Sequence, residues 1–338
     1  MRVRTWGRLV AGLVAVGLLT AACGGSNSGS SSGGSGGGGD GRPVTGLRVL
    51  VPNSPGSGYD TTARAAVKAM QDAKLARNVE VSNVTGAAGT VGLQRVVNEK
   101  GKDDLIMQMG LGVVGAVYTA KSAATLADTT PLAKLIEEAE AIVVPANSPY
   151  QSISQLVSAW KADPGKLPVG GGSAPGGPDH LAPMLFAQAA GIAPTSVNYV
   201  SYDGGGELLA ALLGAKVTFG ATGVGEIKEQ AKAGKLKVLA VTTATRVEGI
   251  DAPTLKEAGI DLQFSNWRGM VAPGGLTNDQ KQTLVTLLTK MHDSTEWKAT
   301  LKEKNWTDAF LAGTDFDTFL KNEDQRVAKI LRDLGLAA

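Results

Sequence analysis

Four short segments rich in Gly, Ser and Thr have the composition of anion-binding corners. Each follows an apolar stretch that predicts a strand and precedes a pattern that predicts a helix. Such a corner exposes unpaired backbone N–H groups at the positive end of the helix, where a carboxylate can bind without a buried Lys or Arg. We number them corner 1 (residues 54–60), corner 2 (85–90), corner 3 (172–180) and corner 4 (202–206).

Three polar side chains in the corners have two readings each. Asp60 would repel a carboxylate that it touched, so capping its helix and orienting the loop is favoured over direct ligand contact. Tyr59 and Tyr202 offer a phenol to a ligand, but packing over the edge of a domain explains them equally well.

Hydroxyl and basic groups near the corners are also ambiguous. Ser173 and Thr90 have the chemistry to contact a ligand, yet Ser and Thr also serve as turn formers. Arg64 and Arg268 are candidate forks for a carboxylate, with solvated or structural roles favoured for both.

The sequence offers little for catalysis. His180 lies seven residues after Ser173 in one loop, which does not define a triad, and no G-x-S-x-G elbow surrounds Ser173. The only other histidine is His292, expected on the surface of a helix. Without clustered carboxylates or a second cysteine, we expect neither a metal site nor an enzyme.

Residues 110–115, GLGVVG, match the dinucleotide-binding fingerprint literally. That fingerprint needs a second strand ending in an acid roughly twenty residues on. Here Asp128 stands in a polar segment that does not read as a strand. We therefore expect no cofactor, and Gly110 to line the same cleft as the corners.

The elements that must position the corners alternate along the chain, which predicts an α/β fold with a mostly parallel sheet flanked by helices. Ligands of such sheets bind beyond the carboxyl ends of the strands, where all four corners fall. Helices are expected over residues 60–71, 91–98, 113–121, 152–160 and 208–213, from residue 277, and up to Gly335. Strands are expected over residues 47–52, 79–84, 105–109, 141–145, 169–172, 197–202, 217–221, 236–242 and 267–273.

The beginning of the chain reads as an export signal. Residues 1–23 combine three arginines, a short apolar run and small residues before Cys23, the only cysteine. The segment around Cys23, LTAACG, resembles the lipobox of bacterial lipoproteins, which implies a lipidated Cys23. Residues 24–43 are rich in Gly and Ser and predict a flexible tether. The folded part is thus expected outside the cell membrane, anchored to its outer face.

The net charge of the chain argues against nucleic-acid binding. The chain has 33 basic and 31 acidic residues, and loss of the leader removes three arginines and no acid, leaving 30 and 31. A near-neutral protein has no electrostatic basis for binding a polyanion. The length beyond the tether favours two lobes.

From Val44 onward the sequence resembles the extracytoplasmic solute-binding receptors of tripartite tricarboxylate transporters. The matching segments include LRVLVPNSPGSGYDTTAR, TGAAGTVG, GGSAPGGPDHLAPMLFAQAAGI, YDGGGELLAALLGAKV, LKVLAVTTATRV and WRGMVAPGGL, in that order. The resemblance implies a two-lobed periplasmic-binding-protein fold of the second type. Residues 44–143 and 246–338 would form one lobe and residues 144–245 the other, with the ligand between them.

The resemblance also implies which residues bind the ligand and what the protein does. A monomeric receptor would capture a small di- or tricarboxylate by lobe closure and deliver it to a two-subunit integral-membrane transporter. Presentation of the ligand to a membrane signalling protein is the alternative, and a secreted nucleotide-cofactor enzyme is a more distant one. The implied ligand-binding residues are Ser54, Gly56, Ser57, Gly58, Tyr59 and Asp60 in corner 1, Gly86, Ala87, Ala88, Gly89 and Thr90 in corner 2, Ser173, Ala174, Gly176, Gly177 and His180 in corner 3, and Tyr202, Asp203, Gly204 and Gly205 in corner 4.

Overall fold

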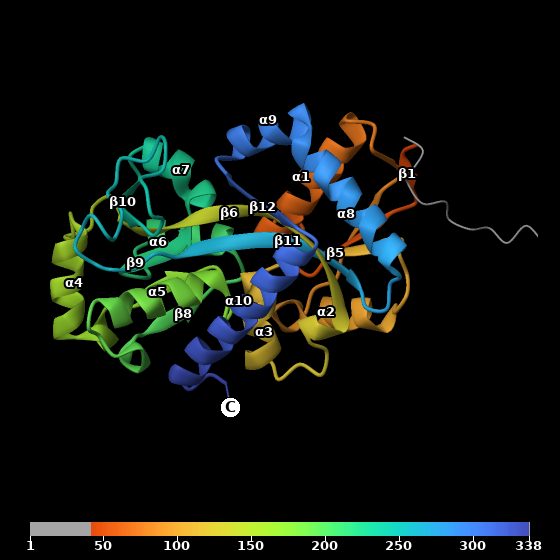
Figure 1. The fold of residues 1–338 in the computed structure, drawn as a ribbon. Helices are drawn as coiled ribbons and strands as arrows, with labels where there is room; N and C mark the ends of the chain where they lie inside the picture. Colours follow the sequence, from red (N-terminus) through yellow and green to blue (C-terminus); the bar gives the residue numbers. More distant parts are fainter. Residues whose placement is uncertain (1–41, 338) are drawn as a thin grey trace, which may run out of the picture. The chain divides into compact units, whose positions relative to one another are not determined.

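The computed structural model describes residues 42–337, so the leader, Cys23 and most of the expected tether lie outside the described residues. Within that range the strands form one ten-stranded mixed sheet and a two-stranded ladder (Figure 1). The strands are β1 (Val44–Thr45), β2 (Arg48–Val51), β3 (Ala76–Arg77), β4 (Glu80–Asn83), β5 (Leu105–Gly110), β6 (Thr129–Pro145), β7 (Val169–Gly171), β8 (Tyr199–Ser201), β9 (Phe219–Gly223), β10 (Leu236–Val241), β11 (Ser265–Pro273) and β12 (Thr307–Ala312). The large sheet has the order β4-β2-β5-β11-β6-β9-β7-β8, with β10 and β12 also paired to β6, while β1 pairs with β3.

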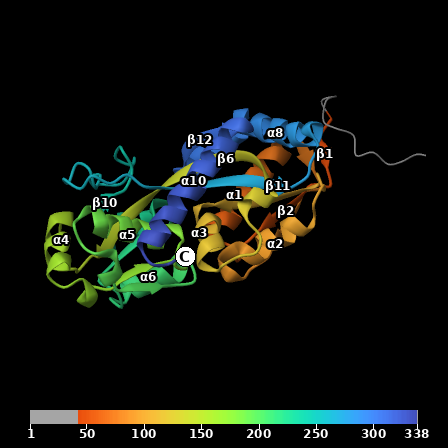
Figure 2. The same ribbon diagram turned by 60° about the horizontal axis from the view of Figure 1, so that its bottom comes forward.

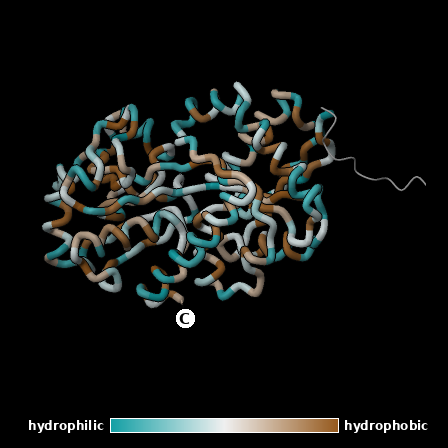
Figure 3. Tube along the Cα trace, viewed as in Figure 1, coloured by the Kyte–Doolittle hydropathy of each residue, from teal (hydrophilic) through white to brown (hydrophobic). Residues whose placement is uncertain are grey.

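Side chains cap two of the expected helices at their first residues. Thr277 and Gln280 form a capping box at the start of α8, and Ser152 accepts a hydrogen bond from the Gln155 N–H at the start of α4. The helices are α1 (Gly58–Asp72), α2 (Thr90–Asn98), α3 (Leu111–Thr119), α4 (Ile153–Ala162), α5 (Pro178–Ala189), α6 (Gly205–Leu213), α7 (Val224–Lys232), α8 (Asn278–Asp293), α9 (Thr295–Lys304) and α10 (Thr314–Asp333). Hydrophobic and hydrophilic residues alternate along their turns (Figure 3).

The long strand β6 belongs to two halves of the sheet. Its residues 129–139 pair with β11, and its residues 140–145 pair with β9 and β10. We call β2, β4, β5, β11, β12 and the beginning of β6 the first half, and β7 to β10 with the end of β6 the second half. The chain leaves the first half through β6 and returns to it through β11.

Apolar side chains cover both faces of the sheet. Helices α1, α8 and α9 pack on one face of the first half, around Met70, Leu288 and Trp297. Helices α6 and α7 pack on the second half around Leu212 and Ile227. Helices α2, α3, α4, α5 and α10 contribute to a third cluster that is continuous across both halves. Figure 2 shows α10 running between α5 and α3.

The α/β class with flanking helices is confirmed, whereas the sheet is mixed and not mostly parallel. The ladders among β2, β4 and β5 and among β7, β8 and β9 are parallel as expected. All ladders formed by β6 and β11 are antiparallel, because β11 brings the chain back against the direction of β6. None of the helices in residues 42–337 is long and apolar enough to span a bilayer.

Candidate functional site

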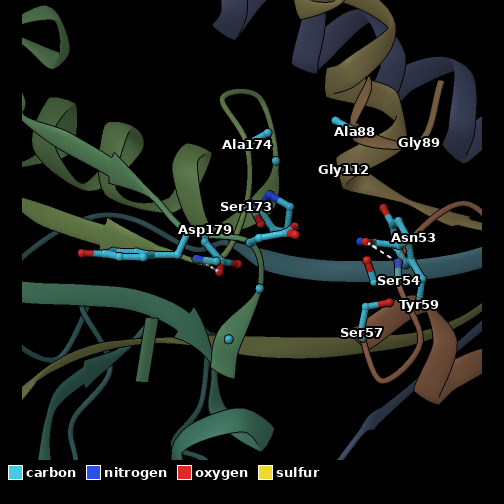
Figure 4. A pocket seen from close by; sticks show the side chains of 18 of the residues that line it. Asn53, Ser54, Ser57, Tyr59, Ala88, Gly89, Gly112, Ser173, Ala174 and Asp179 are labelled. Carbon is cyan, nitrogen blue, oxygen red and sulfur yellow. Dashed lines mark hydrogen bonds between the residues drawn. The ribbon is translucent and has the colours of Figure 1, made fainter. Parts of the chain in front are cut away.

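A cavity of about 1120 Å³ collects residues from all four corners. Corners 1 and 2 follow β2 and β4 in the first half, and corners 3 and 4 follow β7 and β8 in the second half. Each corner therefore lies at the carboxyl end of a parallel strand. Figure 4 shows Ser57, Ala88 and Gly89 on one side of the gap, with Ser173 and Asp179 on the other.

Corner 1 is held in shape by Asp60 from behind the cavity. Asp60 is only 3% exposed, and its carboxylate accepts hydrogen bonds from the Gly56 N–H at 2.8 Å, from Arg64 Nε at 2.9 Å and from Asn83 Nδ2 at 2.9 Å. Burial alone would raise the pKa of this carboxyl, but the hydrogen bonds from Arg64, Gly56 and Asn83 hold that pKa below its usual value. Ser57 caps α1 by accepting from the Asp60 N–H at 3.3 Å.

Tyr59 lies in the cavity wall, where it connects corner 1 to α3. Its hydroxyl accepts a hydrogen bond from the Val113 N–H at 3.2 Å, and burial raises its pKa to about 12. The phenol therefore remains protonated and has its hydrogen available for a ligand. Tyr59 therefore packs against α3 and also lines the cavity, while its hydrogen bond to a ligand stays a prediction.

Corner 2 presents its backbone to the cavity in an unusual conformation. The four residues from Gly86 to Gly89 all have positive φ angles, including 43° at Ala87 and 53° at Ala88. A left-handed conformation at a residue other than Gly costs roughly 1–2 kcal/mol. Successive turns of this kind arrange N–H groups into an anion-binding concavity. Within residues 42–337, no side-chain carboxylate accepts a hydrogen bond from corner 2.

Corner 3 contains its own carboxylate. Asp179 Oδ2 accepts a hydrogen bond from the Gly172 N–H at 2.7 Å, and Asp179 is 6% exposed. Behind the corner, His180 Nδ1 accepts from the Gly176 N–H at 3.2 Å, and burial lowers the pKa of His180 to about 4. His180 is therefore a neutral structural side chain at neutral pH.

Corner 4 also faces a carboxylate. A Cβ added to Gly205 would lie 2.0 Å from Glu226 Oε2, so this carboxylate lies directly against Gly205 at the start of α6. Thr222 Oγ1 donates a hydrogen bond to the same oxygen at 2.7 Å. Glu226 is exposed to the cavity that it lines.

The floor of the cavity, where β6 and β11 pair, carries buried charge. Arg268 on β11 donates to Glu138 Oε2 at 2.8 Å and to Thr62 Oγ1 at 3.2 Å, and it is 5% exposed. Glu140 is fully buried, and neither of its carboxylate oxygens has a hydrogen-bond partner in residues 42–337. Burial and the nearby Asp179 raise the pKa of Glu140 well above its usual value.

Most sequence-predicted residues line this cavity, and the others lie behind it. Asp60 and Thr90 point into their own turns, His180 supports corner 3, and Gly110 and Gly176 pack against neighbouring backbone. The predicted residues that line the cavity are Ser54, Gly56, Ser57, Gly58, Tyr59, Gly86, Ala87, Ala88, Gly89, Ser173, Ala174, Gly177, Tyr202, Asp203, Gly204 and Gly205.

Several lining residues were not assigned from the sequence. Asp179 and Glu226 resemble ordinary acids in the first turn of a helix, a placement that the helix dipole alone explains. Arg268 was considered as a carboxylate fork, and it lines the cavity while paired with Glu138. The other unassigned lining residues include Asn53, Thr85, Gly112, Ser201, Glu207 and Asn266.

The fingerprint-like glycines have packing reasons for being small. A Cβ at Gly110 would lie 2.4 Å from the Trp267 carbonyl oxygen, and one at Gly112 would lie 2.9 Å from the Tyr59 hydroxyl. One at Gly115 would lie 2.0 Å from the Gly176 carbonyl oxygen. In the described part of the chain, no group of three or more acidic, His or Cys side chains is arranged to hold a metal ion.

Comparison with known proteins identifies the family. The model of the tripartite tricarboxylate transporter family receptor matches residues 62–336, which is most of the chain. The chain belongs to this family. Its members are extracytoplasmic solute-binding receptors, not enzymes.

Individual relatives are distant but match along nearly their whole length. The receptor is 25% identical to Protein BugT from Bordetella pertussis over 305 residues, covering 88% of this chain and 91% of the relative. It superposes on MatC from Rhodopseudomonas palustris with bound malate, with a TM-score of 0.74 and 22% identity over 86% of this chain and 99% of MatC. An R. palustris protein solved with adipate gives a TM-score of 0.77 at 22% identity, covering 87% of this chain and 99% of that protein.

Proposed function

We propose that this receptor captures a small organic carboxylate between the two halves of its sheet and delivers it to a two-subunit membrane transporter. The observation that supports this most strongly is that corners from both halves line one cavity. Relatives of the same fold have been solved with malate and with adipate, which are both carboxylates. The di- or tricarboxylate expected from the sequence falls in this class.

The mechanism that we propose is a shift of population toward a closed form. Residues 44–143 and 246–338 would move as one lobe and residues 144–245 as the other, joined through β6 and through the chain between β10 and β11. A ligand contacts corners 1 and 2 together with corners 3 and 4 only when the lobes are closed, so binding favours closure. We also propose that a lipid on Cys23 holds the receptor beside the transporter.

Corner 2 offers the sharpest test of carboxylate capture. Ala88 is exposed and has a φ of 53°, a conformation that Asn and Asp adopt more readily than Ala. Ala88→Asp places a negative charge where we expect the ligand carboxylate, whereas Ala88→Asn has nearly the same shape without the charge. We expect Ala88→Asp to weaken carboxylate binding by about a hundredfold and Ala88→Asn to leave it within a few-fold of the unmodified receptor.

Isothermal titration of the stripped full chain against a panel of small organic carboxylates measures this difference. The panel should include monocarboxylates, dicarboxylates, tricarboxylates and aminocarboxylates, because the cavity alone does not select among them. Absence of heat with every compound would contradict the proposed function. Equal binding by the Asp and Asn variants would show that the carboxylate lies away from corner 2.

A further inference from the structure

The two walls of the cavity differ in charge. Corners 1 and 2 place no carboxylate of their own in the cavity lining, because Asp60 is turned behind corner 1. Across the gap, the lining includes Asp179, Asp203, Glu207 and Glu226. The wall of the first half therefore offers hydrogen-bond donors, while the wall of the second half is acidic.

Two N–H groups of the second-half corners already donate to carboxylates of the same wall. Asp179 Oδ2 accepts a hydrogen bond from the Gly172 N–H in corner 3, and Glu207 Oε2 accepts one from the Asp203 N–H at 3.2 Å in corner 4. The Glu226 carboxylate stands directly against Gly205 at the start of α6. A ligand carboxylate placed here would meet the acidic side chains of Asp203, Glu207 and Glu226, and like charges repel at close range.

Arg268, the cationic side chain that lines the floor, does not neutralise the negative charge of this wall. Arg268 is bonded to Glu138, and a Cβ at Gly58 would lie 2.3 Å from Arg268 Nη2, which places the guanidinium under corner 1. Its charge therefore favours an anion on the side of the first half. Asn266 lines the cavity at the floor and is 6% exposed, and its Oδ1 has no hydrogen-bond partner within residues 42–337. This oxygen is an acceptor without a donor.

We propose that the ligand is a zwitterion, with a carboxylate on corners 1 and 2 and an ammonium group against Asp179 and Glu226. This inference rests on the proposed function and narrows its substrate class from carboxylates to aminocarboxylates. An ammonium group supplies three donors and one positive charge to a wall of acceptors. Glu226 Oε1, which accepts no hydrogen bond within residues 42–337, is free to take one of those donors.

The raised pKa values of the acidic side chains in this wall are those that binding of a cation would lower. Burial and the charge of Glu226 raise the pKa of Asp179 to about 8, and burial also raises the pKa of Glu226. Glu138, Glu140 and Arg268 are the other charged or titratable groups that act on this pair. A bound ammonium lowers the pKa of Asp179, so binding near pH 7 should release a proton. A ligand carboxylate in the same place should instead cause proton uptake.

Matched ligands separate the two possibilities. Glutarate and γ-aminobutyrate have the same chain and differ in one terminal group, as do adipate and δ-aminovalerate. We expect the aminocarboxylate of each pair to bind at least about tenfold more tightly to the full-chain receptor in EDTA, which removes divalent cations that would bridge two carboxylates. Titration in buffers of different ionisation enthalpy should show proton release.

Variants provide the charge control. Glu226→Gln keeps the shape and the contact with Thr222 while removing the charge, so it should weaken aminocarboxylate binding by about tenfold and strengthen dicarboxylate binding. Glu229→Gln, on the outer part of α7 with a side chain that is 79% exposed, should change neither affinity.

Each outcome of these titrations decides one question. Tighter dicarboxylate binding with proton uptake would overturn the zwitterion proposal and leave the carboxylate receptor standing. Failure of both members of each pair to bind, while another carboxylate of the panel binds, would likewise overturn it. No binding by any compound would contradict the proposed function itself.

Discussion

Glu140 is fully buried, and neither of its carboxylate oxygens has a hydrogen-bond partner among residues 42–337. Its folded-state pKa lies well above the ordinary value of 4.5, so the folded protein binds a proton that the unfolded chain has released. The contribution of Glu140 to stability is therefore fully present below about pH 4.5 and declines as pH rises toward its folded pKa. Glu140 makes the receptor less stable at alkaline pH.

Glu140→Gln should remove this penalty because it replaces the acid by a neutral amide of the same shape. We expect the variant to be more stable than the unmodified protein by about 2 kcal/mol at pH 8, with the difference shrinking toward pH 5. Thermal unfolding followed by circular dichroism at both pH values measures it. Glu229→Gln on the surface should show no such trend, and a pH-independent difference at Glu140 would contradict the assignment.

At the scale of elements, α3 and corner 3 meet without room for a side chain. Gly115→Ala would place its Cβ 2.0 Å from the Gly176 carbonyl oxygen, and this backbone atom cannot move aside cheaply. We expect a loss of about 1–3 kcal/mol in the free energy of unfolding, together with weaker ligand binding because corner 3 shifts.

Gly206→Ala in α6 is the matched control for this prediction. A Cβ at Gly206 meets nothing within 4 Å, so only the better helix propensity of Ala remains and stability should rise by about 0.5–1 kcal/mol. Denaturant unfolding of the two variants gives both numbers. Similar effects of the two substitutions would show that the contact with Gly176 is unimportant.

The strand β6 shows where sequence patterns stop being informative. A strand was expected only over residues 141–145, but β6 begins at Thr129. Lys134, Glu138 and Glu140 interrupt the apolar pattern of its first part, although all three are buried. Their burial depends on partners from β11, α5 and α7, which local periodicity does not reveal. The elements α9 and β12 also were not expected from the sequence.

The corners were predictable because their chemistry is local. Strand, Gly-rich turn and helix follow one another within a few residues, and the α/β alternation then places the turns at one edge of the sheet. The acidic wall was not predictable, because Asp179 and Glu226 become neighbours only when α5 and α7 both pack against β9. A single sequence therefore indicates a site for an anion but does not reveal the acidic wall on the other side of the same cavity.

At the scale of the whole molecule, the proposed closure concerns β6 and β11, which pair beneath the cavity with register shifts between Arg268 and Gly269 and between Met270 and Val271. Bulges of this kind are places where strands bend. We expect saturating ligand to lower the radius of gyration measured by small-angle X-ray scattering. Ala88→Asp at the same ligand concentration should remain unchanged, and an unchanged radius in the unmodified receptor would contradict lobe closure.

Because β6 supplies paired edges to both halves, neither half is a self-sufficient module. A fragment starting at residue 140 would deprive β11 and β12 of their partner in residues 129–139, and a fragment starting after residue 145 would also deprive β9 and β10 of theirs. Unpaired strand edges promote aggregation. The receptor should therefore be split into complementing fragments, or have one half exchanged with a homologue, only at positions outside residues 129–145. The strands that pair with β6 must then find it again when the two pieces associate.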